Sequence, residues 1–369
     1  MYRVGIRELN SDGVRLPRRL YEQTSRNVRY IIDSYIGYFD TGQFIELLGH
    51  PQSFNALCAA ASLEPYTTSS VTALLSILKD NSSLEYGFAV VGWVNNRELS
   101  LPKGFDRAAY DLGLPSSTAD HLRRCSTLVG KVDNYAVQDG YRIWFHCMVF
   151  SRRGEWSIVQ IGSRPSVNRV YHWFSERAIA SNFVEEPHTG LISEASSKYV
   201  LDFTFRSNGE LRSALIDVIK EPISKLRTVK LARPDGLQLR LTSFGDEEND
   251  AQSSEFNPLS LPVKVNWQVI EELRSHTIRN FTELLAWRKV GEQLLRFLAV
   301  CAANMYGVKI NLTDRAQLIN QLIRPVDPER VKGLIYDLME AIKFSGMSKD
   351  AAKVAMARVS SYVNESLGY

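Results

Sequence analysis

The segment from residue 131 to residue 188 concentrates side chains of the types that catalyse reactions in proteins. It holds one lysine, two aspartates, two glutamines and three of the six histidines: Lys131, Asp133, Gln138, Asp139, His146, Gln160, His172 and His188. Burying such groups without partners is costly, so a purely structural region has little reason to collect them. We therefore predict that any catalytic site of this protein lies in this segment.

Two kinds of chemistry fit these residue types. Asp133, Asp139 and His146 could ligate a divalent metal ion that activates water. Alternatively, Lys131 and Asp133 could form an amine–carboxylate pair in which a desolvated lysine makes a Schiff base. The spacing matches neither the His-Glu-x-x-His motif nor an EF-hand loop, so the sequence leaves both chemistries open.

Several of these residues also have a purely structural interpretation. Asp139 lies where a hairpin turn favours aspartate, and His146 on a strand is compatible with a hydrogen-bonded core histidine. The tryptophans Trp144, Trp156 and Trp173 are typical of a hydrophobic core. An enzyme requires the eight polar side chains to converge in one cleft, whereas their dispersal would remove the support for catalysis.

A β-meander is the framework that we expect to position these side chains. Its predicted order is an extended segment at Asp133–Val137, a hairpin turn at Asp139-Gly140, a strand at Tyr141–Phe150, a turn at Arg152–Gly154 and a strand at Trp156–Ile161. Because side chains alternate between the two faces of a strand, Trp144, His146 and Met148 should share one face of the middle strand.

Helical periodicity dominates the rest of the chain. Before the meander it predicts helices over Pro17–Ile36, from Asp40 or Thr41 through Phe54, over Val71–Leu78 and from Ser116–Thr118 to Val129, with a strand at Phe88–Trp93. After the meander it predicts strands at Val200–Phe205 and Leu237–Leu241 and helices at Leu211–Leu226, Trp267–Leu273, Phe281–Tyr306, Ala316–Ile323, Pro328–Phe344 and Lys349–Leu367. We predict an α+β protein with a mainly helical part at 1–130, an α+β core at 131–244, an acidic linker at 245–262 and a helical C-terminal domain at 263–369.

Composition narrows the classes of protein to which this chain can belong. Of its 369 residues, 44% are hydrophobic and 23% charged, which is ordinary for a globular protein. No apolar run is long enough to span a membrane, no secretory signal is visible, and the four cysteines are far apart, so we expect a cytoplasmic protein without a membrane partner. Nucleotide-binding glycine loops are absent, which argues against a cofactor-dependent metabolic enzyme.

Basic residues gather in two parts of the chain, although the net charge is only +3. Six arginines lie between Arg142 and Arg177 against two glutamates, and from Leu261 onward fifteen Lys and Arg face eleven Asp and Glu. Both segments are compatible with phosphate contacts.

Four sequence stretches resemble the domain-of-unknown-function 763 family of archaea and some bacteria. They are Lys131–Tyr141, Trp156–Gln160, Tyr171–Trp173 and Glu186–Gly190, and they occur in the order that the family has. The resemblance implies a C-terminal helix–hairpin–helix element whose turn opens a helix and binds DNA phosphate. The matching stretch, Phe281–Ala299, keeps Gly291 but carries Lys289 in place of the family's first glycine.

These observations together predict a DNA-processing protein of the nuclease or base-excision type. Its catalytic groups would be the eight polar residues of the central segment, and Arg288, Lys289, Gly291 and Arg296 would contact DNA. A divalent metal is a possible cofactor. The alternative is a non-catalytic DNA-binding or assembly protein that retains the same fold as a scaffold.

Overall fold

A six-stranded sheet forms the centre of the protein, for which we use a computed structural model that describes residues 17–94, 101–229, 259 and 265–368. The strand order is β1-β3-β4-β5-β6-β8, antiparallel except for the parallel pair β6-β8. The strands are β1 (Phe88–Val94), β3 (Arg142–Ser151), β4 (Trp156–Arg164), β5 (Val167–Phe174), β6 (Gly190–Ser193) and β8 (Gln317–Leu318). A second, two-stranded sheet pairs β2 (Val137–Gln138) with β7 (Leu201–Asp202).

One group of helices covers the first face of the sheet. It consists of α1 (Arg18–Tyr38), α2 (Thr41–Gly49), α3 (Pro51–Ala60), α4 (Thr68–Asn81), α13 (Pro328–Lys343) and α14 (Lys349–Ser366). These helices form a core with the strand residues Phe145, Val149 and Ile161. The carboxylate of Asp40 accepts a hydrogen bond from the Gln43 amide at 2.7 Å, so the predicted cap of α2 is confirmed.

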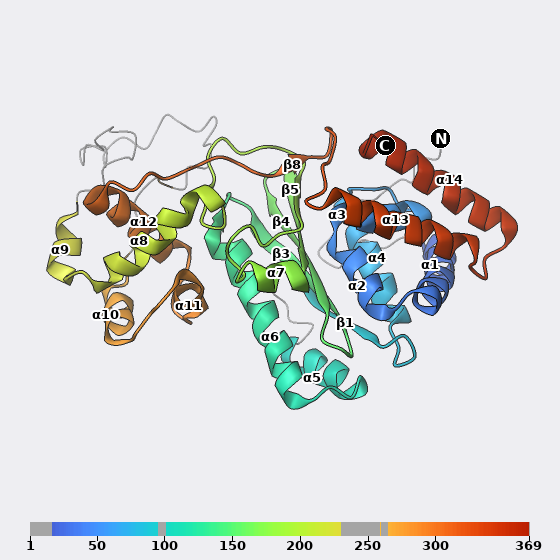
Figure 1. The fold of residues 1–369 in the computed structure, drawn as a ribbon, viewed down its shortest axis with the longest axis horizontal. Helices are drawn as coiled ribbons and strands as arrows, with labels where there is room; N and C mark the ends of the chain where they lie inside the picture. The colour runs from blue at the N-terminus through green and yellow to red at the C-terminus, as the bar shows by residue number, and fades with distance from the viewer. Residues whose placement is uncertain (1–16, 95–100, 230–258, 260–264, 369) are drawn as a thin grey trace.

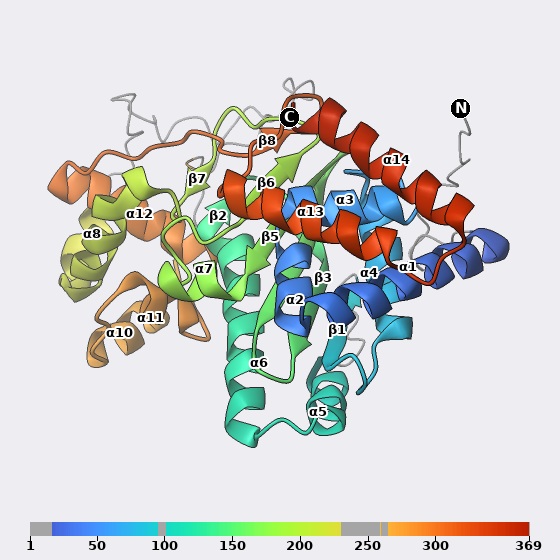
Figure 2. The same cartoon turned by 45° about the vertical axis from the view of Figure 1, so that its right-hand side comes forward.

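A second group of helices packs on the opposite face. It consists of α5 (Leu101–Asp111), α6 (Ser116–Lys131), α7 (Ser175–Ala180), α8 (Gly209–Lys220), α9 (Ile223–Thr228), α10 (Trp267–Ser275), α11 (Phe281–Ala286) and α12 (Glu292–Tyr306). Their core includes Met148, Trp156 and Trp173 from the sheet. The predicted α+β class is thus confirmed, and helices lie on both sides of the sheet in Figures 1 and 2.

The helices that follow residue 263 are divided between these two cores. α10, α11 and α12 pack on α8 and belong to the second core, whereas α13 and α14 pack on α1 and α3 in the first. The sequence predicts one C-terminal helical domain here, but periodicity cannot specify which partner an amphipathic helix buries its face against. The predicted linker at 245–262 lies outside the described residues apart from the buried Leu259, as does the strand predicted at Leu237–Leu241.

The start of the meander differs from the prediction. The segment expected to be extended, Asp133–Val137, is instead mostly a π-helix, η1 (Val132–Ala136), that continues α6. Asp139 and Gly140 do not close a hairpin, because β2 pairs with β7 rather than with β3. They form a bend between the two sheets in which Gly140 has φ of 85° and Asp139 accepts a hydrogen bond from the Tyr141 amide at 3.0 Å.

The rest of the meander is present, with a bulge in β3. The predicted strands are β3 and β4, joined at Arg152–Gly154, and β5 follows as the next antiparallel strand. A register shift between Ile143 and Phe145 turns Trp144 toward the first core, while Met148 stays in the second. The prediction that Trp144 shares a face with Met148 is therefore wrong, because a β-bulge resets the alternation of side chains.

Three predicted helices are also interrupted or absent. Pro222 separates α8 from α9 within the predicted Leu211–Leu226 helix, because proline supplies no amide hydrogen for the helix. Residues 287–291 separate α11 from α12, and the segment Ala316–Ile323 contains the strand β8 rather than a helix. β8 forms because its residues pair with β6, a long-range contact that outweighs local helix propensity. None of the described helices is both long and apolar enough to cross a membrane.

Candidate functional site

The carboxylate of Asp133 is the centre of a buried polar network. Asp133 is 0% exposed and lies in the π-helix η1, facing β4 and β5. Its Oδ1 contacts His188 Nε2 at 2.6 Å, and its Oδ2 accepts hydrogen bonds from Trp173 Nε1 at 2.8 Å and from Gln160 Nε2. These partners satisfy both carboxylate oxygens inside the protein, as buried charged groups require.

The network continues from Gln160 to the helix α6. The Oε1 atom of Gln160 lies 3.0 Å from His146 Nδ1, and His146 Nε2 lies 2.9 Å from the Ser126 hydroxyl. Burial lowers the pKa of His146 to about 4, so its ring is neutral at pH 7. Burial raises the pKa of Asp133, while the neighbouring His188 and Trp173 oppose this shift. Four of the eight predicted catalytic residues therefore meet in one chain of hydrogen bonds.

Asp139 belongs to a separate cluster. Its Oδ2 accepts hydrogen bonds from Arg169 Nη1 at 2.9 Å and from the Tyr171 hydroxyl at 2.6 Å. Arg169 is 1% exposed and also donates to Asp314 at 2.7 Å, so one guanidinium bridges two carboxylates. Removing one partner of such a buried ion pair strongly destabilises the protein, because the other charge then stays buried without a partner. The contacts assign Asp139 a structural task in joining the bend after β2 to β5.

Lys131 and Gln138 hold the loop between α11 and α12. The Lys131 ammonium donates to three consecutive backbone carbonyls, those of Leu285 at 2.9 Å, Ala286 at 3.3 Å and Trp287 at 2.6 Å. It therefore caps the C-terminal end of α11, where the helix dipole favours a cation. The Nε2 atom of Gln138 donates to the Glu292 carbonyl at 3.0 Å, in the first turn of α12. Neither side chain joins the Asp133 network.

His172 points away from the other predicted catalytic residues. It is 1% exposed and contacts Phe54 of α3 in an edge-to-face arrangement, with ring centroids 5.3 Å apart. Burial lowers its pKa to about 3. Its neighbours on β5, Tyr171 and Trp173, face the second core, so alternation along the strand puts His172 on the opposite side.

The three residues predicted to ligate a metal do not form a metal site. Asp133 is bonded to His188, Asp139 to Arg169 and His146 to Ser126 and Gln160. Within the described parts of the chain, no group of three or more His, Cys, Asp or Glu side chains is placed to hold a metal ion. Residue types alone could not predict the absence of a metal site among these three residues, because each of them has different hydrogen-bond partners in the folded protein.

The segment expected to form a helix–hairpin–helix element contains two helices joined by residues 287–291. α11 ends at Ala286, and α12 begins after Gly291, where a Cβ atom would meet only open space within 4 Å. No side chain caps the N-terminus of α12 among the described residues, so its first amides are available to a ligand. Arg288 is exposed, whereas the exposed Lys289 pairs with Glu272 at 2.6 Å.

Arg296 is partly buried and contacts other side chains of the protein. It donates to Gln138 Oε1 at 3.1 Å and also pairs with Glu292, so it braces the first turns of α12 against β2. Burial lowers its pKa. Of the four predicted DNA contacts, Arg288, Lys289 and Gly291 lie at the turn and Arg296 lies behind it.

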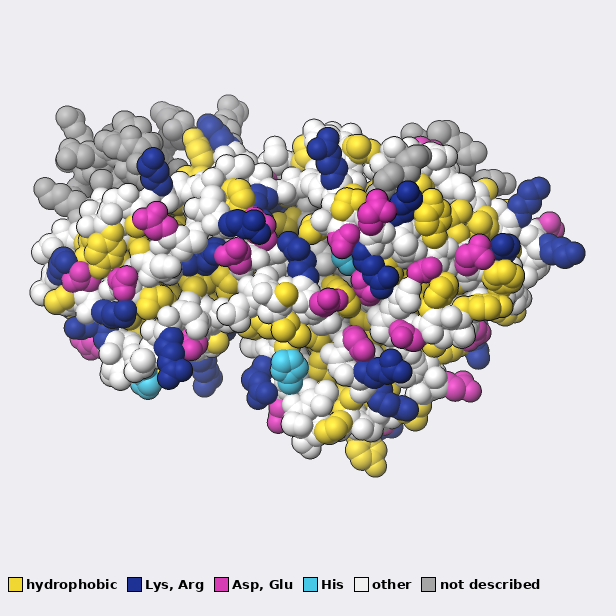
Figure 3. All heavy atoms as spheres, in the orientation of Figure 1, with side chains coloured by type: hydrophobic (Ala, Val, Ile, Leu, Met, Phe, Trp, Pro, Cys, Tyr) yellow, Lys and Arg dark blue, Asp and Glu magenta, His cyan; other side chains and the backbone are white. Residues whose placement is uncertain are grey.

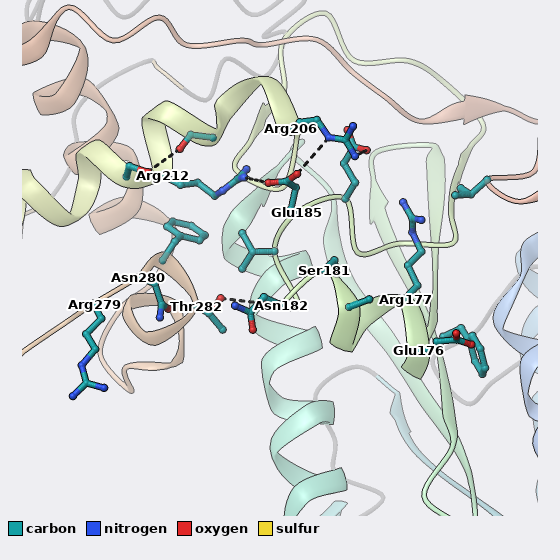
Figure 4. A pocket seen from close by; sticks show the side chains of 18 of the residues that line it. Glu176, Arg177, Ser181, Asn182, Glu185, Arg206, Arg212, Arg279, Asn280 and Thr282 are labelled. Atoms are coloured by element: carbon teal, nitrogen blue, oxygen red, sulfur yellow. Dashed lines mark hydrogen bonds and ion pairs between the residues drawn. The ribbon is translucent and has the colours of Figure 1, made fainter.

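An open cavity of about 1380 Å³ lies beside this element, and its arginines were not among the predicted site residues. It is bordered by α2, α7, α8, the start of α11 and α13, and Figure 4 shows Arg177, Arg206 and Arg212 along it. In Figure 3, Lys and Arg side chains form a band across the middle of the face, with Asp and Glu among them. The two basic segments of the sequence contain some of these cavity residues, namely Arg177 in the first and Arg279 and Arg330 in the second.

Comparison with known proteins identifies the family of this chain. A family model described as a protein of unknown function, DUF763, matches residues 5–319 of the 369. No curated protein and no solved structure matches the chain. The matched region includes the Asp133 network, the hairpin between α11 and α12 and the strand β8, but not α13 or α14. Because the match spans well over half of the sequence, the chain belongs to the DUF763 family.

Proposed function

We propose that this protein binds DNA through the hairpin between α11 and α12. The observation that carries the proposal is the uncapped N-terminus of α12 directly after Gly291, beside the exposed Arg288. Free amides at a helix N-terminus attract phosphate, because they donate hydrogen bonds and the helix dipole is positive there. The open space at Gly291 lets a phosphate approach the backbone closely.

The rigidity of the hairpin supports this proposal. Lys131 holds three carbonyls at the end of α11, and Gln138 holds the carbonyl of Glu292. A prearranged turn binds phosphate without first having to be ordered, which preserves affinity. Residues of the central segment thus support the proposed DNA contact by positioning it, rather than by touching the DNA.

Replacing Arg288 by glutamate tests the proposal. Each phosphate contact contributes to the salt dependence of binding, so Arg288→Glu should weaken duplex binding by roughly tenfold at low salt and flatten the dependence of affinity on salt. The loss should be similar for unrelated sequences, because phosphate contacts do not read bases. Fluorescence anisotropy of labelled duplexes over a salt series measures both effects.

Arg358→Glu is the matched control. It introduces the same charge change at an exposed position of α14, which packs on α3 at the other side of the sheet. Its duplex affinity should stay within about twofold of the parent's, since exposed charges beyond a Debye length are screened. Equal losses for the two variants would point to nonspecific electrostatics, and an undiminished affinity of Arg288→Glu would refute the hairpin as the contact.

DNA processing is a second candidate function, carried by the pairing of Asp133 with His188. The imidazole Nε2 lies 2.6 Å from Asp133 Oδ1, while Nδ1 has no hydrogen-bond partner in the described residues. A carboxylate that orients one ring nitrogen is the pattern of a general base in hydrolysis, and because Nδ1 is buried, a substrate would reach it only after the surrounding residues move. The three carbonyls around the Lys131 ammonium favour this hydrolytic chemistry over a Schiff base.

The variant Asp133→Asn tests the processing function. Asparagine retains the shape of the side chain but cannot stabilise an imidazolium, so strand cleavage or base release should fall by at least about a hundredfold. Gel assays on intact, nicked and base-damaged duplexes, with and without a chelator, would measure this loss, and circular dichroism would verify the fold. If the parent protein processes none of these substrates, the DNA-binding scaffold is the function that stands.

A further inference from the structure

The cavity beside α11 has the size and lining of a polymer site. Its volume of about 1380 Å³ exceeds the roughly 300–1,000 Å³ typical of pockets for single small molecules. The start of α11 lines the cavity at Asn280 and Thr282, whereas the end of the same helix forms the hairpin. At a rise of 1.5 Å per residue, these two ends of the six-residue helix are only about 9 Å apart.

Arginines and glutamates form a network of shared ion pairs along one wall of this cavity. Glu185 pairs with both Arg212, at 3.0 Å, and Arg206, at 3.4 Å, and Glu186 lies 3.7 Å from Arg206. Arg315, behind the wall, lies 3.8 Å from Glu186 and is bonded to the buried Asp202. Among the lining residues of this wall, Arg177, Arg206 and Arg212 thus lie beside Glu176, Glu185 and Glu186, and both Glu185 and Glu186 are shared between two arginines.

Arg177 is the cation on this wall that has no carboxylate partner among the described residues. Its Nε donates to the His188 carbonyl at 2.8 Å, which fixes the side chain and leaves both terminal nitrogens for a ligand. Burial lowers its pKa, and the nearby Arg315 and Arg206 add to this effect against the opposing Glu186. Crowded guanidinium groups of this kind are stabilised by a bound anion, and phosphate accepts two hydrogen bonds from one guanidinium.

His50 is a polar side chain that lines the end of the cavity near α13. It is 6% exposed and lines the cavity with the ion pair of Glu46 and Arg330. Its Nδ1 has no hydrogen-bond partner in the described part of the protein. Buried polar atoms in native proteins nearly all have a partner, so an ordered water or a ligand in the cavity would satisfy this atom.

Uncharged polar groups line another side of the cavity, together with Arg279. Figure 4 shows Asn182, Asn280 and Thr282 on this side, below Arg212 and Arg206 and to the left of Arg177 in the view. The loop that carries Asn182 has three residues with positive φ, namely Asn182 at 55°, Phe183 at 62° and Glu186 at 50°. Such conformations cost free energy and concentrate at ligand-binding loops. Amides and hydroxyls can pair with base edges, which are exposed only in an unpaired strand.

We propose that this cavity binds an unpaired strand of DNA, with its phosphates on Arg177 and Arg206 and a further contact at His50. The proposal rests on the proposed binding of duplex at the hairpin, since α11 would carry the duplex at one end and the unpaired strand at the other. The protein would therefore prefer a duplex with a single-stranded tail over a blunt duplex of the same length.

Anisotropy measurements with three labelled DNAs test this proposal: a blunt duplex, the same duplex with an unpaired tail, and the tail alone. Arg177→Gln and Arg206→Gln should each weaken binding of the tailed duplex and of the tail by about tenfold, the effect of losing one charge-assisted contact, and leave the blunt duplex unchanged. Arg206 is 73% exposed, so its variant should fold even if loss of the Arg177 contact to His188 disturbs the loop.

Arg153→Gln, at an exposed turn of the meander, is the control and should bind all three DNAs like the parent. If the parent binds the tail but no blunt duplex, the hairpin proposal fails while the cavity proposal stands. If Arg177→Gln and Arg206→Gln both bind the tail as the parent does, the cavity proposal is overturned. Tighter binding of an RNA tail of the same sequence would also overturn it, because RNA would then be the ligand.

Discussion

Individual side chains of the central segment owe their properties to burial. Asp133 and Asp139 are both 0% exposed, and each has its carboxylate oxygens bonded to other side chains or to backbone. His146 is 1% exposed and is hydrogen-bonded at both ring nitrogens. An imidazole that stays neutral in the folded protein lowers the free energy of unfolding wherever the same imidazole is protonated in the unfolded chain. Such a residue therefore makes stability depend on pH.

His146→Gln should reduce the loss of stability in mild acid. The folded-state pKa of His146 is lowered to about 4, whereas its unfolded value is about 6.5. Between these values the unfolded chain binds a proton that the folded chain does not, so stability falls as pH decreases from about 6.5 to 4 and is unaffected by this group at pH 7. Glutamine does not titrate, so the variant should lose up to roughly 3 kcal/mol less over this window.

Urea unfolding of both proteins at pH 7, 6, 5 and 4.5 measures this difference. The raised pKa of Asp133 acts with the opposite sign, because the folded state then takes up its proton first as the pH falls. That contribution is present in both proteins and cancels in the comparison. Parallel pH profiles for parent and variant would show that His146 is protonated in the folded state as readily as in the unfolded state.

At the scale of elements, the end of α6 and its continuation η1 connect the sheet to the hairpin. Lys131 ends α6 and caps α11, while Asp133, two residues later, faces β4 and β5. Gln138 on β2 completes the connection by contacting the first turn of α12. Residues that the sequence suggested as catalytic therefore position the hairpin that we propose to bind DNA.

Lys131→Met should loosen the hairpin without unfolding the protein. Methionine retains most of the apolar stem but removes the three hydrogen bonds to residues 285–287, at a cost of about 1–3 kcal/mol. Amide hydrogen exchange between residues 285 and 295 should become faster, and duplex affinity should fall because the turn is less ordered. Lys343→Met, at the exposed end of α13, is the control and should leave exchange in the hairpin unchanged.

At the scale of the whole molecule, the sheet separates two cores that both include helices from the chain beyond residue 263. α12 packs on α8 in one core, and α14 packs on α3 in the other. Removing the chain beyond residue 263 would therefore remove helices from both cores. The acidic sequence 246–255, which has no large apolar residue, is where we still expect the chain to be cut first by proteases.

A cut in 246–255 should give fragments near 1–250 and 256–369 that remain associated. Two cores hold them together, so they should co-elute in native size-exclusion chromatography and separate only in denaturant. Gel electrophoresis with mass spectrometry would locate the cut. Separation of the fragments under native conditions would contradict the packing of α10–α14, and first cleavage elsewhere would contradict the choice of site.

The sequence by itself determined the elements whose signals are local. The helix predicted to start at Pro328 does so, the strands β3 and β4 lie where β-branched and aromatic residues gather, and Asp40 caps α2. The family and the α+β class could likewise be predicted, because motif order and alternating periodicities are properties of the chain alone.

Only the tertiary structure decided which polar groups meet. Asp133 contacts His188, which lies 55 residues away, and Lys131 contacts carbonyls more than 150 residues away. Asp139, six residues after Asp133, instead contacts Arg169, and His172 lies on the opposite face of β5. Spacing along the chain predicts which face of an element a residue occupies, but long-range partners are set by packing of the whole core, where most buried polar groups find a hydrogen bond.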